Sequence, residues 1–472
     1  MMQYDVVIIG AGPAGMSAAV ELDRLGLSVA LADEQPSPGG QIWRGTERNT
    51  SGQVFEALGA DYKKGQALAR AFRTSGVAYF PSTQIWQIEE GWTLFATSAQ
   101  EARRISARAV LLATGAQERP VPFPGWTLPG VMTVGAAQIL LKSGGMLPQG
   151  DVWIAGAGPL PLLYATQILQ LKGRIAGFID TSTGLNLAAL AKLPGAWRDI
   201  AGLAKGIRWL RALRRCVRMV RNSEDLRAGG DDRLKYLEWR AQGKSERVKA
   251  DVLLVHEGVI PRIHETLALD CSHEWNGEQG YLAPSLDRWG ETSRPGLFVA
   301  GDAGGIGGWV SATVSGKIAA LGIARRLGIS RDIDALRKET GLDAQQVRAL
   351  ALRPFLDRLY PPPRNGIADQ TIVCRCEEVT AGTIRAVARS SAPDANAVKA
   401  ATRCGMGPCQ GRQCGYSVQA LIADTHGLPQ KDVTFFNIRP PLKPVTLGEL
   451  ASLHNLETAA APSGVKAERM TP

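Results

Sequence analysis

A glycine-rich loop near the N-terminus constrains the fold of this chain more than any other feature. The loop reads Gly10-Ala11-Gly12-Pro13-Ala14-Gly15 and follows a short apolar run over residues 4–9. Residues 16–25 then have a helical pattern, and residues 27–32 read as a second strand. A strand, loop, helix and parallel strand in this order form a βαβ unit. The sequence therefore predicts a dinucleotide site, because backbone amides and a helix N-terminus can hold a pyrophosphate there.

The glycines of this loop have separate tasks in such a site. Gly10 permits the tight turn, Gly12 lets the phosphate approach, and Gly15 lets the helix pack on the strand. An acid at the end of the second strand is expected to bind the ribose hydroxyls. Asp33 stands at that position, with Glu34 beside it as the alternative.

A second unit of the same kind begins at residue 151. A strand over 151–155, a helix over 162–171 and a strand over 174–180 surround the loop Gly156-Ala157-Gly158-Pro159-Leu160-Pro161. Pro161 replaces the third glycine, and its ring takes up space where a bare Cα lets helix and strand close up. A proline in the first helical turn does not break the helix. Asp180 ends the next strand, so this loop could hold NAD, another adenine nucleotide or nothing.

Three further apolar runs, over residues 110–115, 251–258 and 296–302, also read as strands that end in glycine turns. Together with Gly39-Gly40-Gln41, their order and spacing resemble the two-dinucleotide-domain flavoproteins, which include the glutathione and thioredoxin reductases. The resemblance covers about residues 4–327 and implies FAD at the first loop. It implies that Asp302, after Gly301, contacts the ribityl or phosphate portion, and that Thr114-Gly115 lies near the adenine half. The redox-active CxxC of those reductases is missing here.

Two tight cysteine pairs lie near the C-terminus, Cys374-x-Cys376 and Cys409-x4-Cys414. Five of the seven cysteines fall in one window of 41 residues, which is no secreted disulfide framework and favours a metal or catalytic site. Zinc sites usually have C-x2–4-C spacing in both arms, so the C-x-C arm favours an iron–sulfur cluster. The surrounding residues 374–378 and 402–414 resemble the bacterioferritin-associated ferredoxin-like [2Fe–2S] domain, a small helical module.

Cys404 complicates the choice of ligands, because Cys404-x4-Cys409 is a rival arm of equal spacing. The resemblance favours Cys374, Cys376, Cys409 and Cys414, since the paired cysteines of that family flank the Gln-Gly-Arg step. Cys404 then lies near the cluster without binding it.

Charge and length restrict the other possibilities. The chain has 472 residues and a net charge of +10, with eight basic residues between Arg198 and Arg221. That amphipathic run predicts a helix or helix pair whose basic face is solvated, meets an acidic partner, or lies on a membrane or nucleic acid. No run of 18 apolar residues and no signal peptide are present, so a cytoplasmic location is expected.

The whole layout resembles the α subunit of bacterial hetero-oligomeric amino-acid dehydrogenases, including opine (octopine or nopaline) oxidases, D-hydroxyproline dehydrogenase, dye-linked proline dehydrogenase and hydrogen cyanide synthase. The resemblance implies a partner β subunit similar to D-amino-acid oxidases, and a small ferredoxin-like γ subunit in some members. It implies oxidation of a secondary amine in the partner, with electrons passing to a quinone or dye. An FMN between the subunits is implied by the family alone. No catalytic residue is assigned, because none of the five histidines falls in a motif near the flavin.

The predicted fold class is α/β, with two Rossmann-like domains and a small helical [2Fe–2S] domain. The expected parts are a split FAD domain (1–116 and 290–330), a NAD(P)-like domain (117–289), a linker (331–368), the [2Fe–2S] domain (369–440) and a tail (441–472). Two alternatives remain open at this point. One is a self-sufficient NAD(P)H-dependent reductase that feeds the cluster, which Asp180 supports, and the other is a non-catalytic scaffold.

Overall fold

The first sheet carries the N-terminal glycine loop. The computed structural model describes residues 2–99, 101–182, 184–363 and 366–460, with side chains up to 453. Its largest sheet has the order β3-β2-β1-β6-β5-β4, with β19 paired to β6. The bounds are β1 (Met2–Ile9), β2 (Val29–Ala32), β3 (Ala78–Phe80), β4 (Gln84–Glu89), β5 (Thr93–Ser98), β6 (Glu101–Leu112) and β19 (Leu297–Val299). Strands β1, β2, β3, β6 and β19 are parallel, as expected for a doubly wound fold.

Two helices cover the loop that follows β1. Helix α1 (Pro13–Arg24) begins three residues earlier than its apolar pattern predicts, because Pro13 is well suited to the first helical position. Helix α10 (Gly308–Arg326) packs across it. The approach is close, since a Cβ on Gly316 would lie 2.2 Å from the carbonyl oxygen of Ala14. The predicted small-residue helix after β19 thus holds α1 in place behind the loop.

The second sheet is fully parallel and repeats the same design. Its order is β11-β10-β9-β15-β8, with β8 (Val131–Thr133), β9 (Val152–Gly156), β10 (Gly177–Asp180), β11 (Met219–Arg221) and β15 (Val252–His256). Helices α4 (Val134–Gly144), α5 (Pro159–Gln170) and α8 (Ile200–Cys216) belong to this half. Pro161 lies buried in the first turn of α5, which continues unbroken as expected. The middle of the predicted basic run forms a single helix, α8, whereas Arg198 precedes it and Arg218 and Arg221 follow it, the last in β11.

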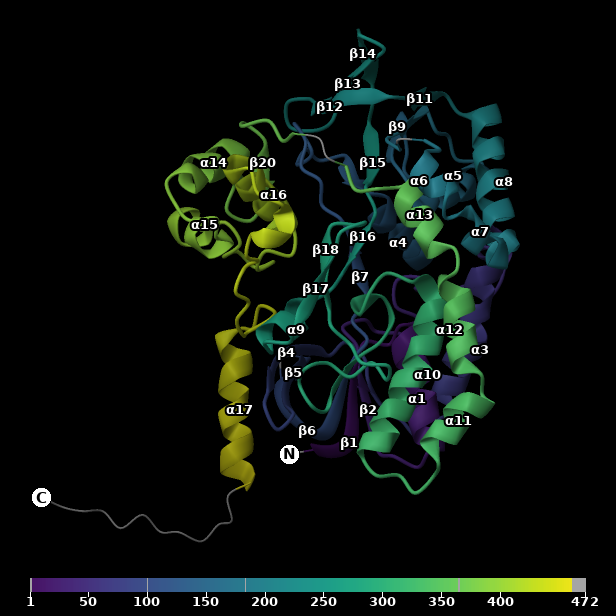
Figure 1. The fold of residues 1–472 in the computed structure, drawn as a ribbon, viewed down its shortest axis with the longest axis vertical. Coiled ribbons are helices and arrows are strands. Elements are labelled where there is room, and N and C mark those ends of the chain that lie inside the picture. The colour runs from purple at the N-terminus through teal and green to yellow at the C-terminus, as the bar shows by residue number, and fades with distance from the viewer. Residues whose placement is uncertain (1, 100, 183, 364–365, 461–472) are drawn as a thin grey trace, which may run out of the picture.

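Short antiparallel pairs complete this part of the chain. The ribbon of β7 (Ala116–Glu118) and β16 (Val259–Pro261) links the two sheets. A three-stranded hairpin of β12 (Ser223–Gly229), β13 (Tyr236–Ala241) and β14 (Lys244–Lys249) projects from the second half at the top of Figure 1. Strands β17 (His273–Asn276) and β18 (Tyr281–Pro284) form another pair beside β16.

The cysteine-rich region is a separate small module with its own core. It contains β20 (Ile372–Cys374), β21 (Val379–Thr380), α14 (Ala381–Arg389), α15 (Ala395–Thr402) and α16 (Gly415–His426). Its apolar core includes Val398, Val418, Leu421 and Phe436. Figure 1 shows the module on the opposite side of the molecule from α8. It is the small helical domain that the sequence predicts.

The segments before and after this module pack on the dinucleotide fold. Helices α11 (Ile333–Glu339), α12 (Leu342–Leu350) and α13 (Arg353–Leu359) fill the predicted linker. Helix α17 (Leu447–Ala460), in the predicted tail, packs on β6, where the amide of Ala102 donates to Ser452 Oγ at 2.8 Å. The rest of that tail lies outside the described residues. Among the described helices, none combines the length and apolar character that a membrane span requires.

Candidate flavin site and metal centre

The first glycine loop leaves a space of the right shape for a pyrophosphate. A Cβ on Gly15 would lie 1.9 Å from the carbonyl oxygen of Gly10, and one on Gly10 would lie 2.5 Å from that of Ala113. Both positions therefore require glycine for packing. A Cβ on Gly12, by contrast, would meet only the Cα of Gly40, at 3.9 Å. Gly12 caps α1 with no side chain, so the first amides of the helix remain available to an anion.

Asp33 lies just after β2 and holds the loop in shape. Its carboxylate accepts the amide hydrogens of Ala11 at 2.5 Å and Gln35 at 2.7 Å. Burial raises the pKa of Asp33, and these two bonds only partly oppose that effect. The sequence predicts a ribose contact for this acid. The structure adds a direct hydrogen bond between Asp33 and Ala11 of the glycine loop.

Glu34, the alternative acid, meets a residue from the other end of the chain. Its Oε1 lies 2.5 Å from Lys443 Nζ, and the lysine side chain is 15% exposed. Burial works against ionisation here, but the hydrogen bond and charge of Lys443 lower the pKa of Glu34. Sequence reasoning missed Lys443, because nothing in the local sequence relates residue 443 to the end of β2.

The other predicted flavin residues surround the same loop. The amide of Gly39 donates to the carbonyl of Ala11 at 2.8 Å, and Gly40 packs on Gly12. Gln41 accepts a bond from Arg44, whose buried Nε has no partner among the described residues. Arg44 is a further candidate that sequence reasoning missed, although a cation three residues after Gln41 is a visible signal. The unpaired Nε–H of Arg44 could donate a hydrogen bond to an oxygen of a bound cofactor.

The two more distant predicted segments also end at this side of the sheet. Thr114 and Gly115 follow β6, and the buried Oγ1 of Thr114 has no hydrogen-bond partner within the described chain. Gly301 and Asp302 follow β19. Asp302 Oδ1 accepts the amides of Gly307 and Gly308, each at 2.9 Å, and so caps α10. Open glycine positions, free amides and orphaned polar atoms together fit a dinucleotide such as FAD.

A buried lysine connects this region to the second Rossmann half. Lys142, on α4, donates from Nζ to the carbonyl of Gln41 at 3.0 Å and to Gln138 Oε1 at 2.8 Å. Gln138 in turn donates to Gln167 on α5 at 3.0 Å. Burial, reinforced by the charge of Arg44, lowers the pKa of Lys142 to about 7. These bonds link α5, the helix that follows the second glycine loop, to Gln41, which lies beside the first glycine loop.

The second glycine loop keeps an open position but gains acidic neighbours. A Cβ on Gly158 would meet nothing within 4 Å, whereas one on Gly156 would lie 2.1 Å from the carbonyl oxygen of His256. Asp180 accepts the hydroxyl of Ser182 at 2.6 Å and lies 3.5 Å from Arg221. Burial raises the pKa of nearby Glu257 to about 7. Asp180 ends β10 and is placed to accept a ribose hydroxyl.

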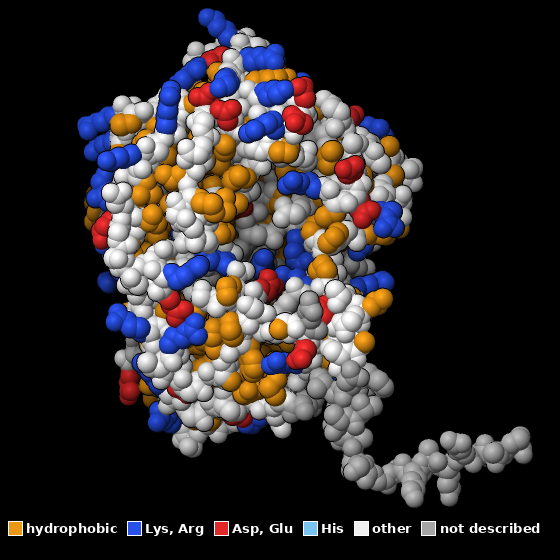
Figure 2. All heavy atoms as spheres, turned by 180° about the vertical axis from the view of Figure 1, so that it is seen from behind, with side chains coloured by type: hydrophobic (Ala, Val, Ile, Leu, Met, Phe, Trp, Pro, Cys, Tyr) orange, Lys and Arg blue, Asp and Glu red, His pale blue; other side chains and the backbone are white. Residues whose placement is uncertain are grey.

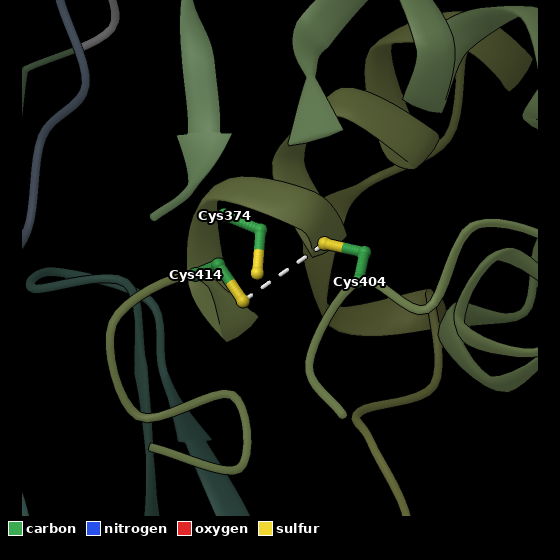
Figure 3. Close-up of side chains that lie close together, drawn as sticks. All are labelled: Cys374, Cys404 and Cys414. Atoms are coloured by element: carbon green, nitrogen blue, oxygen red, sulfur yellow. Dashed lines mark hydrogen bonds between the residues drawn. The ribbon is translucent and has the colours of Figure 1, made fainter. Parts of the chain in front are cut away.

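The cysteine arms bring five thiols into one small volume. The sulfurs of Cys374, Cys404 and Cys414 lie within 4.8 Å of one another, and all three residues are buried (Figure 3). Cys404 Sγ is 3.9 Å from Cys414 Sγ. The thiols of Cys376 and Cys409 interact with each other beside them. The structure thus groups two predicted ligands, Cys374 and Cys414, with Cys404, while the predicted ligands Cys376 and Cys409 form a second pair.

Hydrogen bonds show which sulfur carries negative charge most easily. The Cys404 and Cys414 thiols and the amides of Gly405 and Glu377 donate to Cys374, and these bonds lower its pKa. The bonds to Cys374 raise the pKa values of both Cys404 and Cys414. Thiolates and sulfides of iron–sulfur clusters are stabilised by such amide donors, so this donor set fits a [2Fe–2S] cluster.

The loop that carries Cys409 is attached directly to the dinucleotide fold. Gln117 donates to the carbonyl of Arg412 at 2.6 Å, and His264 Nε2 lies 3.2 Å from the carbonyl oxygen of Gln410. Burial, then the charge of Arg412, lowers the pKa of His264 to about 3, so its imidazole is neutral and donates Nε2–H. At another point of the interface, Nε1 of Trp126, in the dinucleotide fold, donates to the carbonyl of Ile372 in the module at 2.6 Å. The metal module and the flavin fold therefore share an interface in which side chains of the flavin fold donate to backbone carbonyls of the module.

Comparison with known proteins assigns the same two regions. Residues 4–316 match the family described as pyridine nucleotide-disulphide oxidoreductase, and residues 372–424 match the BFD-like [2Fe-2S] binding domain. The chain is 43% identical to the opine oxidase A subunit of Rhizobium meliloti (strain 1021) over 460 residues, 96% of this chain and 99% of the relative. It is 32% identical to the HcnB subunit of hydrogen cyanide synthase from Pseudomonas aeruginosa (strain PAO1), covering 97% of this chain and 100% of the relative.

Among solved structures, L-proline dehydrogenase from P. horikoshii superposes with a TM-score of 0.69. The match covers 95% of this chain and 79% of that chain at 21% identity, and it shows the fold alone. The predicted fold class is confirmed. The matched families together with the gathered cysteines confirm FAD and a [2Fe–2S] cluster as the cofactors.

Proposed function

Because this chain belongs to the pyridine nucleotide-disulphide oxidoreductase family and to the family of opine oxidase A subunits, we propose that it carries electrons away from an amine oxidised on a partner flavoprotein. The chain is an FAD- and [2Fe–2S]-containing subunit of a hetero-oligomeric oxidoreductase acting on CH–NH groups. The observation that carries the proposal is likeness over nearly the full length of subunits named as parts of such complexes, with the metal module docked on the flavin fold.

The partner is proposed to be a β subunit similar to D-amino-acid oxidases, joined in some arrangements by a small ferredoxin-like γ subunit. There the amine carbon loses a hydride equivalent and the nitrogen a proton, so that a secondary amine becomes an imine and two electrons are released. The substrate class is an opine, D-hydroxyproline or proline. When bound, FAD accepts electrons in pairs and the cluster passes them singly. The absence of a CxxC pair beside the first loop fits a subunit without dithiol chemistry.

The residues of this chain are proposed to act in two groups. FAD is bound by Gly10, Gly12, Pro13, Ala14, Gly15, Asp33, Glu34, Gly40, Gln41, Thr114, Gly115, Gly301 and Asp302. The cluster is bound by Cys374, Cys376, Cys409 and Cys414. The open space over Gly12 and the converging thiols support these assignments.

The path beyond the cluster is proposed to end at a quinone or a dye. A quinone acceptor suits a cytoplasmic complex that sits peripherally at the inner membrane. An FMN at the subunit interface and an adenine nucleotide at Gly156–Pro161 complete the proposal. Asp180 supports the adenine nucleotide, because its carboxylate ends β10 as a ribose-binding acid does.

The test uses the complex purified through a tag on this chain. Anaerobic addition of a secondary amine of the proposed classes is expected to bleach the flavin absorbance and then reduce the cluster. NADH at micromolar concentration is expected to leave both unchanged. The proposal fails if the chain copurifies with no flavoprotein partner, or if no such amine reduces the complex.

One alternative keeps specific support, a self-sufficient NAD(P)H-dependent reductase that feeds its own cluster. The open position at Gly158 and the acid Asp180 favour it. Pro161 opposes it, because its ring occupies the first turn of α5, where a bare Cα would let helix and strand close up. Rapid bleaching of the isolated chain by NADH would establish this alternative over the electron-transfer role.

A further inference from the structure

The segment around α8 leaves an unusual set of apolar side chains in water. Leu187 is 84% exposed, Leu185 is 65% exposed and Trp197 is 64% exposed. Leu190, Ile200 and Ile207 add to the same stretch. Single exposed apolar residues are ordinary, but six large ones within 23 residues of the chain are unusual, and such a concentration favours an interaction site.

The same segment carries cations that the protein does not neutralise. Between residues 184 and 216 stand seven basic residues and one acid, Asp199, which is used to cap Gly202 at the start of α8. Of the basic residues only Lys205 forms an ion pair, with Asp61 on α3 (Ala60–Arg73). In the part of the chain that the structure describes, the other six form neither ion pair nor side-chain hydrogen bond: Lys192, Arg198, Arg208, Arg211, Arg214 and Arg215.

The geometry of α8 separates a packed face from this outward face. Leu213 is buried, and Trp209 and Leu210 pack on the main apolar core of the protein. Ile200, Ile207, Arg211 and Arg215 are exposed at helical spacing, so they share one face. Figure 1 places α8 along the outer edge of the molecule, and in Figure 2 basic side chains gather on that edge.

We propose that residues 185–215 dock this protein on an anionic phospholipid surface. Leu185, Leu187, Leu190 and Trp197 enter the headgroup region, and the arginines of α8 contact lipid phosphates. Helices with a basic face and a Trp- or Leu-rich edge bind membranes in this way, lying in the interface without crossing it. Long arginine side chains also reach phosphates while their stems cover apolar surface.

Charge complementarity favours a bilayer over a second protein at this face. The 17 residues of α8 extend over about 25 Å, and cations continue along it without an intervening acid. A protein partner would need acidic groups matched to each of the six unpaired cations, whereas anionic lipids supply continuous negative charge. The inference deepens the peripheral location proposed above. Its test needs neither amine nor electron acceptor, so its failure and the failure of the proposed reaction are separate results.

The experiment is sedimentation of the loaded full-length chain with phospholipid vesicles. Vesicles of phosphatidylcholine with phosphatidylglycerol are compared with vesicles of phosphatidylcholine alone, at low and high salt. The chain is expected to sediment with the anionic vesicles only, and to be released by salt because screening weakens the attraction. Equal binding to both vesicles, or binding to neither, overturns the proposal.

Two variants divide the contributions of charge and apolar insertion. Arg211→Glu/Arg215→Glu is expected to weaken anionic binding by more than about tenfold, since each basic residue contributes substantially to attraction by anionic lipid. Trp197→Ser/Ile200→Ser is expected to weaken binding to the anionic vesicles at low salt, because apolar insertion adds to the electrostatic attraction. Flavin absorbance and thermal unfolding show that each variant is folded.

The matched control reverses two exposed cations elsewhere. Lys244→Glu/Arg389→Glu makes the same change in net charge on the β14 hairpin and the cysteine module. It is expected to bind vesicles like the unaltered chain. If the control loses binding equally, attraction is general and the proposal falls. It also falls if the α8 variants keep vesicle binding but lose a copurifying subunit, since the face is then a protein interface.

Discussion

The sulfur of Cys404 lies 3.9 Å from that of Cys414, and both lie beside Cys374 in the core of the small module. A cluster with four cysteine ligands therefore forms among five thiols. The spacing in the chain makes Cys404-x4-Cys409 and Cys409-x4-Cys414 equivalent. The proposed ligands remain Cys374, Cys376, Cys409 and Cys414. Because Cys404 lies as close, substitution of single cysteines has to decide between Cys404 and Cys414 as the fourth ligand.

Serine substitutions separate these ligand sets. Cys414→Ser is expected to lose most of its iron, whereas Cys404→Ser is expected to keep about two irons per chain, the content of a [2Fe–2S] cluster. Iron content and visible absorbance of anaerobically prepared protein provide the measurement. Cys216→Ser, an exposed cysteine far from the module in sequence, is the control. Iron loss in Cys404→Ser together with retention in Cys414→Ser would exchange the roles of the two residues.

Two alanine substitutions in the first glycine loop should have different effects. Gly12→Ala is expected to lower FAD affinity at least about tenfold, because its methyl group occupies the space of the pyrophosphate. Its apoprotein should unfold at the temperature of the unaltered apoprotein. Gly15→Ala places a Cβ 1.9 Å from the carbonyl oxygen of Gly10, so it should also destabilise the apoprotein by about 1–3 kcal/mol. Flavin content and apoprotein melting distinguish them. Equal melting of both variants would contradict the packing role of Gly15.

The contact of Lys443 with Glu34 should make stability depend on pH in the acid range. The folded pKa of Glu34 is lowered, so the contact is fully present above the unfolded value of about 4.5 and is lost as pH falls through the lower folded value. Because Glu34 is 40% exposed, Lys443→Met should cost only about 1 kcal/mol at neutral pH. Urea unfolding of Lys443→Met, Glu34→Gln and the double variant measures the coupling. Additive effects of the two substitutions would show that the contact contributes nothing.

The buried amine of Lys142 should also make stability rise with pH, here from neutral pH into the alkaline range. Its pKa of about 7 lies below the unfolded value of about 10.5, so the unfolded chain binds more protons between these values. Stability should therefore rise from about pH 7 to about pH 9 by up to about 1.4 kcal/mol per pH unit, relative to Lys142→Met. Unfolding by urea at both pH values provides the comparison, with the exposed Lys338→Met as control. A parallel pH dependence in unaltered chain and Lys142→Met would show that Lys142 stays charged when folded.

Lys142 also offers a spectroscopic prediction about the flavin segment. Lys142→Met removes the bond to the carbonyl of Gln41, which lies next to the glycine pair packed on the first loop. Below about pH 7, where Lys142 is charged, we expect a shift in the flavin absorbance spectrum and a lower flavin midpoint potential in the variant, since a positive charge nearby favours the reduced form. Gln167→Leu, which alters the network without touching Gln41, should shift neither. An unchanged potential in Lys142→Met would separate this lysine from the flavin.

Local pattern was sufficient for much of the fold. The strands before Gly10 and Gly156, the helix over α10 and the helical basic run at α8 were all predicted from periodicity and from glycine positions. Each of these signals depends on residues within one or two turns of each other. The ends were less accurate, as α1 shows by beginning at Pro13. The contacts of α17 with β6 had no such signal, since they join residues far apart in the chain.

Local sequence patterns were enough to predict two dinucleotide folds, their order, and a cysteine module after them, because strand, loop and helix propensities are local and the ligand spacing is short. Tertiary structure alone decided that Lys443 meets Glu34, that Lys142 reaches Gln41, and that Cys404 lies among the cluster thiols. Such neighbours depend on how whole elements pack, and packing responds to the shape and burial of many side chains at once.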